Sequence, residues 1–233
     1  MTSRLVLLPG MDGTGDLFEE FVKALPDTFQ TVTVRYPTDV CLGYAGLEPF
    51  VREAAPVSEP FVLLAESFST PLAIRYAATN LPNLRGLILC AGFVASPLRG
   101  WRRLLALMAA PIVFRLPMPD LFLRFLVGED ASLNMQAEVR KAISAVKPKV
   151  LASRLHAVLA CDESAELVQV KMPILYLQAS QDRLVPASSH DEIRQISPQM
   201  EILFIAGPHL LIQREPRMTA EAVARFVGRL PMH

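Results

Sequence analysis

Short runs in which nearly every residue is apolar alternate along this chain with segments of helical periodicity. A strand that is apolar at every position must be buried on both faces, which happens in parallel sheets that helices cover on both sides. The alternation of strands with helices therefore predicts a doubly wound α/β sheet with right-handed crossovers. The six expected strands are RLVLL (4–8), TVTVR (31–35), PFVLLA (60–65), GLILC (86–90), PILYLQ (173–178) and EILFIA (201–206).

The expected helices carry start signals. Asp16 and Glu19 have the spacing of a capping box, so Asp16 is expected to cap a helix. Pro71 and Pro216 suit the first turn of the helices that follow them.

One long stretch, from about residue 96 to 170, contains no convincing strand. It consists of apolar helical patterns interrupted by prolines. Because strands precede and follow it, this stretch is expected to be a helical insertion into an otherwise regular α/β domain. A length of 233 residues suits one such domain.

Composition excludes several classes of protein. The formal net charge is zero and the pI is about 6.9, so there is no electrostatic basis for binding nucleic acid. The three cysteines are far apart and do not have metal-ligand spacing, which favours a reducing compartment. The N-terminal apolar run is too short for a signal peptide, and LLALMAAPIVF (104–114) is shorter than the roughly 20 residues of a membrane span. We expect a soluble, cytoplasmic protein.

Three residues that suit nucleophilic catalysis each follow an expected strand. A serine hydroxyl is a weak nucleophile that needs a base in hydrogen-bond reach, and that base needs an orienting acid. Ser67, Asp182 and His209 follow the third, fifth and sixth strands within a few residues. Such groups gather at the carboxyl ends of parallel strands. The chain order Ser, Asp, His is the order of the α/β-hydrolases.

Four motifs carry a resemblance to that family: LLPGMDGTG (7–15), LLAESFST (63–70), SQDRLVP (180–186) and GPHLLIQREP (207–216). Together they resemble the α/β-hydrolase fold superfamily, in the form of a small serine esterase with a helical lid, over nearly the whole chain. The resemblance implies a mainly parallel sheet of about six strands with helices on both faces. It implies a core of residues 1–95 and 171–233, with residues 96–170 inserted as the lid.

The resemblance also assigns roles. Ser67 would be the nucleophile, His209 the general base and acid, and Asp182 the group that orients the imidazole. The backbone N–H groups of Met11 and Phe68 would form the oxyanion hole. No metal and no organic cofactor would be needed. The residues expected beside the substrate are Gly10, Asp12, Trp101, Leu105 and Met108; Asp12 would also hold loop N–H groups in an Asx-turn.

The chain departs from the family pattern at the nucleophile. The usual G-x-S-x-G motif has Ala65 and Ser69 in place of its glycines. Both side chains are small, so Ser67 is still expected on a strained turn with a positive φ. On this interpretation Ser69→Gly should be tolerated and Ser69→Leu should damage folding or activity.

Simpler interpretations remain open beside these. Ser67 suits an ordinary helix cap, Asp182 suits a turn, with Asp162 as a rival acid, and His209 suits a packed core position. Glu66 is either solvated or bonded within the turn.

The function expected is hydrolysis of small carboxylic esters with short to medium, apolar acyl groups. Thioesterase, lactonase, C–C hydrolase and acyltransferase activities would use the same residues, and a non-catalytic binding protein is the alternative from another class. Trp101 and the arginines of the lid's first half form either a solvated face or a surface for weak lipid contact. The arginines of this surface are Arg99, Arg102, Arg103, Arg115 and Arg124.

The sequence leaves the oligomeric state open.

Overall fold

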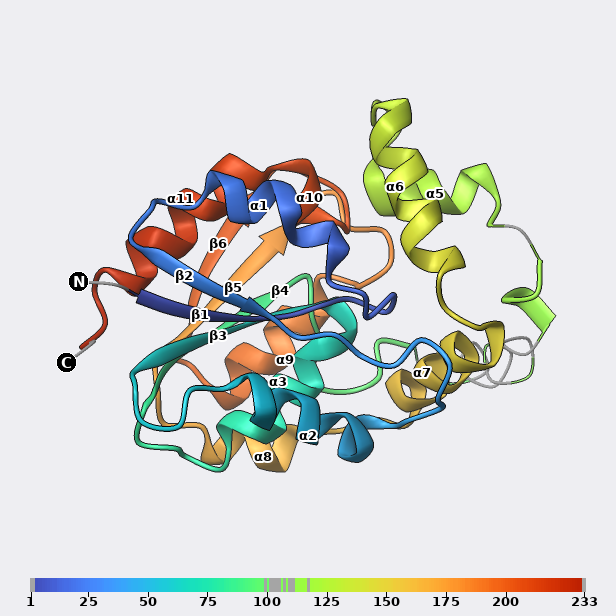
Figure 1. Cartoon of the computed structure of the whole chain (residues 1–233). Coiled ribbons are helices and arrows are strands. Elements are labelled where there is room, and N and C mark those ends of the chain that lie inside the picture. Colours follow the sequence, from blue (N-terminus) through green and yellow to red (C-terminus); the bar gives the residue numbers. More distant parts are fainter. Residues whose placement is uncertain are drawn as a thin grey trace.

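The structure is a computed structural model that describes residues 3–98, 100, 106, 108, 112–116 and 118–231. One parallel sheet of six strands forms its centre, in the order β2-β1-β3-β4-β5-β6 (Figure 1). The expected six-stranded parallel sheet is therefore confirmed, with strand ends shifted by one or two residues. The strands are β1 (Ser3–Leu8), β2 (Phe29–Thr33), β3 (Phe61–Glu66), β4 (Leu84–Cys90), β5 (Ile174–Ala179) and β6 (Glu201–Ile205).

Helices cover both faces of the sheet (Figure 1). Alternate side chains of a strand point to opposite faces, and in β1 Leu5 and Leu7 enter one buried cluster while Val6 and Leu8 enter the other. One face is covered by α1 (Glu19–Ala24), α10 (Leu211–Arg214) and α11 (Pro216–Val227). The opposite face is covered by α2 (Tyr44–Ala54), α3 (Thr70–Ala77), α8 (Ser164–Gln169) and α9 (Ser188–Ile196).

The helix start signals were right for the prolines and wrong for Asp16. Pro71 and Pro216 lie in the first turns of α3 and α11. Asp16 begins a short 3-10 turn, η1 (Asp16–Phe18), and makes no cap hydrogen bond. Its carboxylate instead accepts a hydrogen bond from Arg35 at 2.7 Å, because the chain after β2 brings that guanidinium within reach.

The stretch between β4 and β5 forms α5 (Asp120–Val127), α6 (Leu133–Ser144) and α7 (Pro148–Ala160), which lie beyond the carboxyl ends of the strands (Figure 1). Its two ends meet, since Ala95 and Asp162 form an isolated antiparallel bridge and Ser96 N–H donates to the carbonyl of Cys161 at 3.1 Å. Beyond that bridge, Leu167 of α8 packs in the same cluster as α3 and α9. The division into a core and a lid of residues 96–170 stays a prediction.

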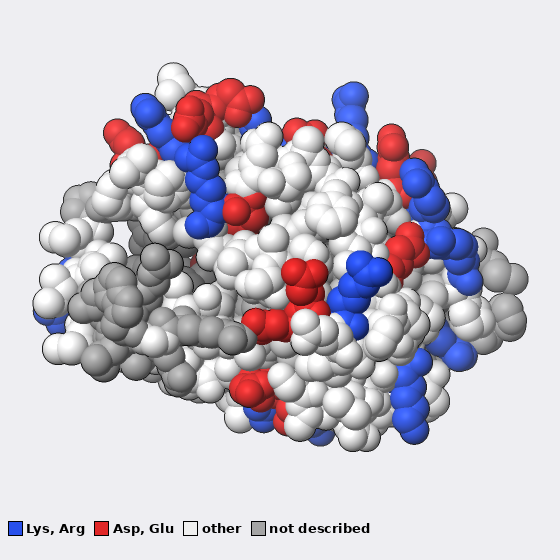
Figure 2. Space-filling model, turned by 180° about the vertical axis from the view of Figure 1, so that it is seen from behind, with Lys and Arg blue, Asp and Glu red and all other residues white. Residues whose placement is uncertain are grey.

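Charge is mixed on the face of the molecule opposite to the view of Figure 1, where basic and acidic side chains are interspersed (Figure 2). Within the described ranges, no helix combines the length and the apolar character that crossing a bilayer requires. Arg99, Arg102 and Arg103 of the expected basic surface lie outside the described residues.

Candidate active site

Ser67 lies at the sharp turn between β3 and α3. The strand runs straight into a 3-10 turn, η2 (Ser67–Ser69), and Ser67 has φ 47°. This left-handed conformation is strained for a residue with a side chain and persists only where the surroundings enforce it. The positive φ expected from the motif is therefore present. No side chain caps η2 or α3, so the interpretation of Ser67 as a simple helix cap is wrong.

The structure brings together the three side chains that the sequence suggested. Ser67 Oγ lies 2.8 Å from His209 Nε2, and His209 Nδ1 lies 2.8 Å from Asp182 Oδ2. A carboxylate only accepts hydrogen bonds, so Nδ1 carries the ring proton and Nε2 is left to accept the hydroxyl proton of Ser67. His209 is thus buried and is bonded on both ring nitrogens, on one side to Ser67 and on the other to Asp182.

Asp182 is held rigidly by its own loop. Its Oδ1 accepts hydrogen bonds from the backbone N–H groups of Leu184 at 2.8 Å and Val185 at 2.9 Å. The carboxylate is therefore fixed in the orientation that meets His209. The rival acid, Asp162, accepts from Ser164 N–H and Oγ just before α8, whereas His209 Nδ1 is bonded to Asp182.

The loop of residues 9–15 after β1 forms a tight turn. Gly13 N–H donates to the carbonyl of Gly10 at 3.1 Å. Asp12 Oδ2 accepts from Thr14 N–H at 2.9 Å and from Thr14 Oγ1 at 2.6 Å, which is the expected Asx-turn. The carboxylate of Asp12 thus serves the loop.

Two backbone N–H groups in these turns suit binding of an anion. Phe68 is the second residue of η2, and the first N–H groups of a helix have no acceptor within that helix. Met11 is in the middle of the turn that Gly10 and Gly13 close. Preorganised N–H groups of this kind can stabilise an oxyanion.

Ser69 joins the two turns. Its buried hydroxyl donates to the carbonyl of Pro9 and lies 2.8 Å from the hydroxyl of Tyr36. The residue that replaces glycine in the usual motif is therefore a polar link between the β3 turn and the β1 loop. The expectation that Ser69→Gly is harmless considered only size and must be revised.

Glu66 directly precedes Ser67 and is 2% exposed, so the solvated interpretation is wrong. Its Oε2 accepts from Gln213 Nε2 at 3.2 Å, while Glu66 Oε1 and Gln213 Oε1 are buried with no hydrogen-bond partner. Burial, together with the nearby charge of Asp12, raises the pKa of Glu66 to about 7. A buried carboxyl group that changes charge near neutral pH therefore adjoins the serine.

Arg154 of α7 was not among the residues suggested by the sequence. It is 1% exposed, and it donates to the carbonyls of Met11 and Asp12, both at 2.7 Å, and of Pro37 at 2.9 Å. The sequence does contain a signal for this buried arginine. Arg154 is four residues from both Val150 and Val158, which places a cation on the apolar face of the helix.

Apolar side chains of the insertion pack against Met11. Val146, Val150 and Leu151 form a buried cluster, against which Met11, Phe114 and Ile143 pack. Of the expected substrate-binding residues, Gly10 and Asp12 lie in the β1 loop, Trp101 and Leu105 fall outside the described residues, and Met108 is 71% exposed.

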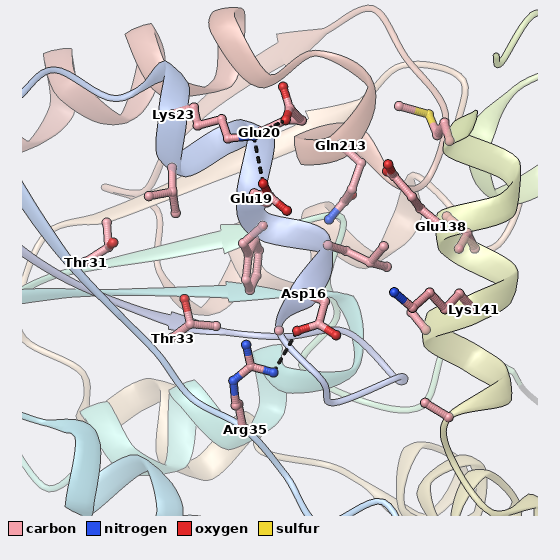
Figure 3. Close-up of a pocket in the computed structure, with 18 residues that line it drawn as sticks. Asp16, Glu19, Glu20, Lys23, Thr31, Thr33, Arg35, Glu138, Lys141 and Gln213 are labelled. Carbon is pink, nitrogen blue, oxygen red and sulfur yellow. Dashed lines mark hydrogen bonds and ion pairs between the residues drawn. The ribbon is translucent and has the colours of Figure 1, made fainter. Parts of the chain in front are cut away.

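A cleft of about 660 Å³ separates α6 from η1, α1 and β2 (Figure 3). Several of the charged side chains that line the cleft form ion pairs. Arg35 pairs with Asp16, and Lys23 pairs with Glu19 and Glu20. Gln213 lines this cleft and also bonds to Glu66. In the part of the chain described, no group of three or more His, Cys, Asp or Glu side chains could hold a metal ion.

Comparisons with known proteins agree with this geometry. The model of the family described as serine aminopeptidase, S33, matches residues 40–229. A pimeloyl-(acyl-carrier protein) methyl ester esterase from Xanthomonas oryzae pv. oryzae is 28% identical, over 97% of this chain and 96% of that protein. Among solved structures, a bromoperoxidase from Bacillus anthracis and an enol-lactonase from Burkholderia xenovorans LB400 superpose with TM-scores of 0.85 and 0.81, at 16% and 14% identity. Each comparison covers 98% of this chain and 92% of the other. At such identities the two structures show a shared fold.

Proposed function

Because the chain belongs to the serine aminopeptidase S33 family of α/β-hydrolase-fold enzymes, we propose that it is a serine hydrolase that cleaves small carboxylic esters. One observation carries the proposal: the continuous hydrogen-bonded chain from Ser67 through His209 to Asp182, with the serine on a strained turn. The relatives named as methyl ester esterases, which match nearly the whole chain, support an ester as the bond cleaved.

The proposed reaction has two halves. Ser67 Oγ attacks the ester carbonyl while its proton passes to His209 Nε2, and the N–H groups of Met11 and Phe68 receive the oxyanion. The tetrahedral intermediate collapses, and the leaving alkoxide takes the proton from His209. Water then loses a proton to His209 and attacks the acyl-enzyme. The carboxylic acid leaves, and the proton returns to Ser67.

The proposed substrates carry short to medium, apolar acyl groups. The support is an apolar wall, the buried cluster of Val146, Val150 and Leu151, against which the side chains of Met11, Phe114 and Ile143 all pack. Since Met11 also carries one proposed oxyanion donor, an acyl chain attached to the bound carbonyl has this wall within reach.

The direct test is hydrolysis of p-nitrophenyl esters by the wild type, Ser67→Ala and Asp182→Asn. Ser67→Ala should fold normally and lose turnover, and Asp182→Asn should lose about 10⁴-fold in kcat because the imidazole loses its orientation. A fluorophosphonate probe should label the wild type at Ser67. A Ser67→Ala variant with wild-type activity, or a wild type that the probe does not label, would refute the assignment.

A panel of substrates separates the related activities. Methyl esters, thioesters, lactones and amino-acyl anilides of graded acyl length share the carbonyl chemistry but differ in the leaving group, and added alcohols report acyl transfer. We expect the highest kcat/KM for esters. Faster cleavage of the anilides would instead assign the peptidase activity in the family's description.

We also propose weak contact of the insertion with lipid surfaces. Exposed apolar side chains near Arg115 and Arg124 support this contact, and co-sedimentation with anionic liposomes tests it. Absence of binding with or without anionic lipid would exclude it. The apolar side chains are Met108, Ile112, Val113, Leu116, Leu121 and Phe122.

A further inference from the structure

Arg154 is a fully buried cation that donates hydrogen bonds to three backbone carbonyls. Taking a guanidinium out of water is costly, and burial lowers the pKa of Arg154 even though the nearby charge of Asp12 opposes this shift. The apolar face of α7 would pack more simply with an aliphatic residue at this position. Its contacts therefore point to a role other than packing.

Those contacts lie on both turns that carry the proposed oxyanion donors. On the β1 loop, Arg154 donates to the carbonyls of Met11 and Asp12. On the β3 turn, its guanidinium carbon lies 6.0 Å from the centre of the Phe68 ring, within the range of a cation–π contact. One side chain thus contacts Met11 and Phe68, which belong to separate loops.

The fit around the guanidinium is close. A Cβ atom added to Gly13 would lie 2.5 Å from Arg154 Nη1, so the guanidinium would have to shift, and Gly13 has φ 68°, which favours glycine. The guanidinium carbon also lies 5.7 Å from the centre of the Tyr36 ring, and the hydroxyl of Tyr36 is hydrogen-bonded to Ser69. The planar fork of an arginine can meet several carbonyls at once, which a lysine ammonium cannot reproduce.

We propose that Arg154 is a positioning residue that fixes the N–H groups of Met11 and Phe68 at the spacing an oxyanion requires. It couples docking of α7 to the assembly of the site. The inference rests on the proposed function, because an oxyanion forms only if Ser67 attacks a carbonyl. Arg154 itself acts through the loops and does not touch the substrate.

The test compares Arg154→Met, Arg154→Lys and a control, Lys149→Met, which removes an exposed cation from the same helix. Displacement of oxyanion donors weakens binding of the transition state more than binding of the substrate. We therefore expect Arg154→Met to lower kcat about 10- to 100-fold with KM within about threefold of wild type. Affinity for a trifluoromethyl ketone, which forms a tetrahedral adduct, should fall by the same factor as kcat/KM. Arg154→Lys keeps the charge but leaves buried carbonyls without a donor, so it should lower the melting temperature no more than Arg154→Met does and should recover less than about a tenth of kcat.

Hydrogen exchange supplies a readout independent of turnover. Amide exchange in the peptide of residues 9–16 should be at least about tenfold faster in Arg154→Met and Arg154→Lys and unchanged in Lys149→Met, while β5 keeps its protection in all three.

Three outcomes are decisive. Unchanged exchange in residues 9–16 overturns the inference by itself. Faster exchange with wild-type kcat, or a loss confined to KM, shows that Arg154 holds the loop without serving the oxyanion site and equally overturns it. A wild type that neither cleaves the substrate panel nor reacts with the fluorophosphonate refutes the proposed function instead, and the exchange result still decides whether Arg154 holds the loop.

Discussion

Single residues around the nucleophile combine small size with buried polar links. Ser69 is small enough for the tight turn, yet its hydroxyl bonds to Pro9 and Tyr36 across the gap between two loops. Glu66 is held without solvent and with one oxygen unpartnered. Substitutions at these positions therefore act through buried polar groups that lose or gain partners, in addition to side-chain volume.

Ser69→Gly should lower the free energy of unfolding by about 1–3 kcal/mol, because the carbonyl of Pro9 and the hydroxyl of Tyr36 lose a buried partner. Urea denaturation measures the change. Tyr36→Phe removes the other partner, so the double variant should be less destabilised than the two single variants added together. Strict additivity would show that the two hydroxyls do not interact.

Glu66→Gln should change how stability depends on pH. The pKa of Glu66 is raised from 4.5 to about 7, so the unfolded chain releases this proton at a lower pH than the folded one. The contribution of Glu66 to the free energy of unfolding is therefore fully present below pH 4.5. It is lost as the pH rises through about 7, and the loss amounts to about 3 kcal/mol. The glutamine variant should lack this loss.

Denaturation of the wild type and Glu66→Gln at several pH values between 4 and 8 checks this prediction. Glu138→Gln, which alters an exposed carboxyl group on α6, is the matched control and should follow the wild type. Parallel curves for the wild type and Glu66→Gln would contradict a buried, neutral Glu66.

At the scale of elements, the helices of the insertion hold the loops at the carboxyl ends of the strands. The loop of His209 is tied to α5, because Leu210 N–H donates to the carbonyl of Leu126 at 2.9 Å. The β1 loop is tied to α7 through Arg154. Loops that carry functional groups are therefore anchored by elements on a different part of the chain.

The wall of α6 and α7 yields a prediction on chain length. Ile143→Ala opens space at the apolar cluster against which Met11 also packs, so the preferred acyl chain should become longer, with kcat/KM rising about fourfold for each further methylene that fits. Assays with p-nitrophenyl esters from acetate to decanoate measure the shift. Leu133→Ala, which changes an exposed residue of α6, should leave the preference unaltered. An unshifted optimum in Ile143→Ala would place the acyl chain elsewhere.

Elements and local turns could be predicted from the sequence, whereas contacts between distant segments could not. The strands could be predicted because burial on both faces leaves an apolar run. Ser67, Asp182 and His209 could be predicted because each lies in the loop or turn that follows a strand. The contacts of Arg154 with Asp12 cross 142 residues, and no local pattern reports such a contact. Asp16 was misjudged because a tertiary ion pair with Arg35 replaced a local cap.

At the scale of the whole molecule, the chain leaves and re-enters the sheet domain at a single point. Ala95 and Asp162 are bridged, and Glu163 N–H donates to the carbonyl of Val94 at 2.9 Å. Within the segment between them, side chains of α5 and α6 form a buried cluster that also includes Leu210 of the sheet domain. This arrangement supports the prediction that the segment is inserted into the sheet domain.

Replacing residues 97–160 with a short Gly-Ser linker should therefore leave the sheet folded while abolishing ester hydrolysis, since Arg154 and the apolar wall are removed. Circular dichroism and thermal melting report the fold. Replacing residues 97–170 is the matched comparison. It also removes α8, whose Leu167 packs between α3 and α9, and should prevent folding. Equal stability of the two deletions would contradict a core that resumes at Asp162.

The distance along the chain between Ser67 and its base has a consequence during synthesis. His209 follows the serine by 142 residues, so at 5–20 residues per second the ribosome needs about 7–28 s to add it. Until then β1 and β3 can pair, but the hydroxyl has no group to take its proton. On the proposed mechanism, the nascent chain is therefore inert toward esters in its surroundings until His209 has been added and has reached the serine.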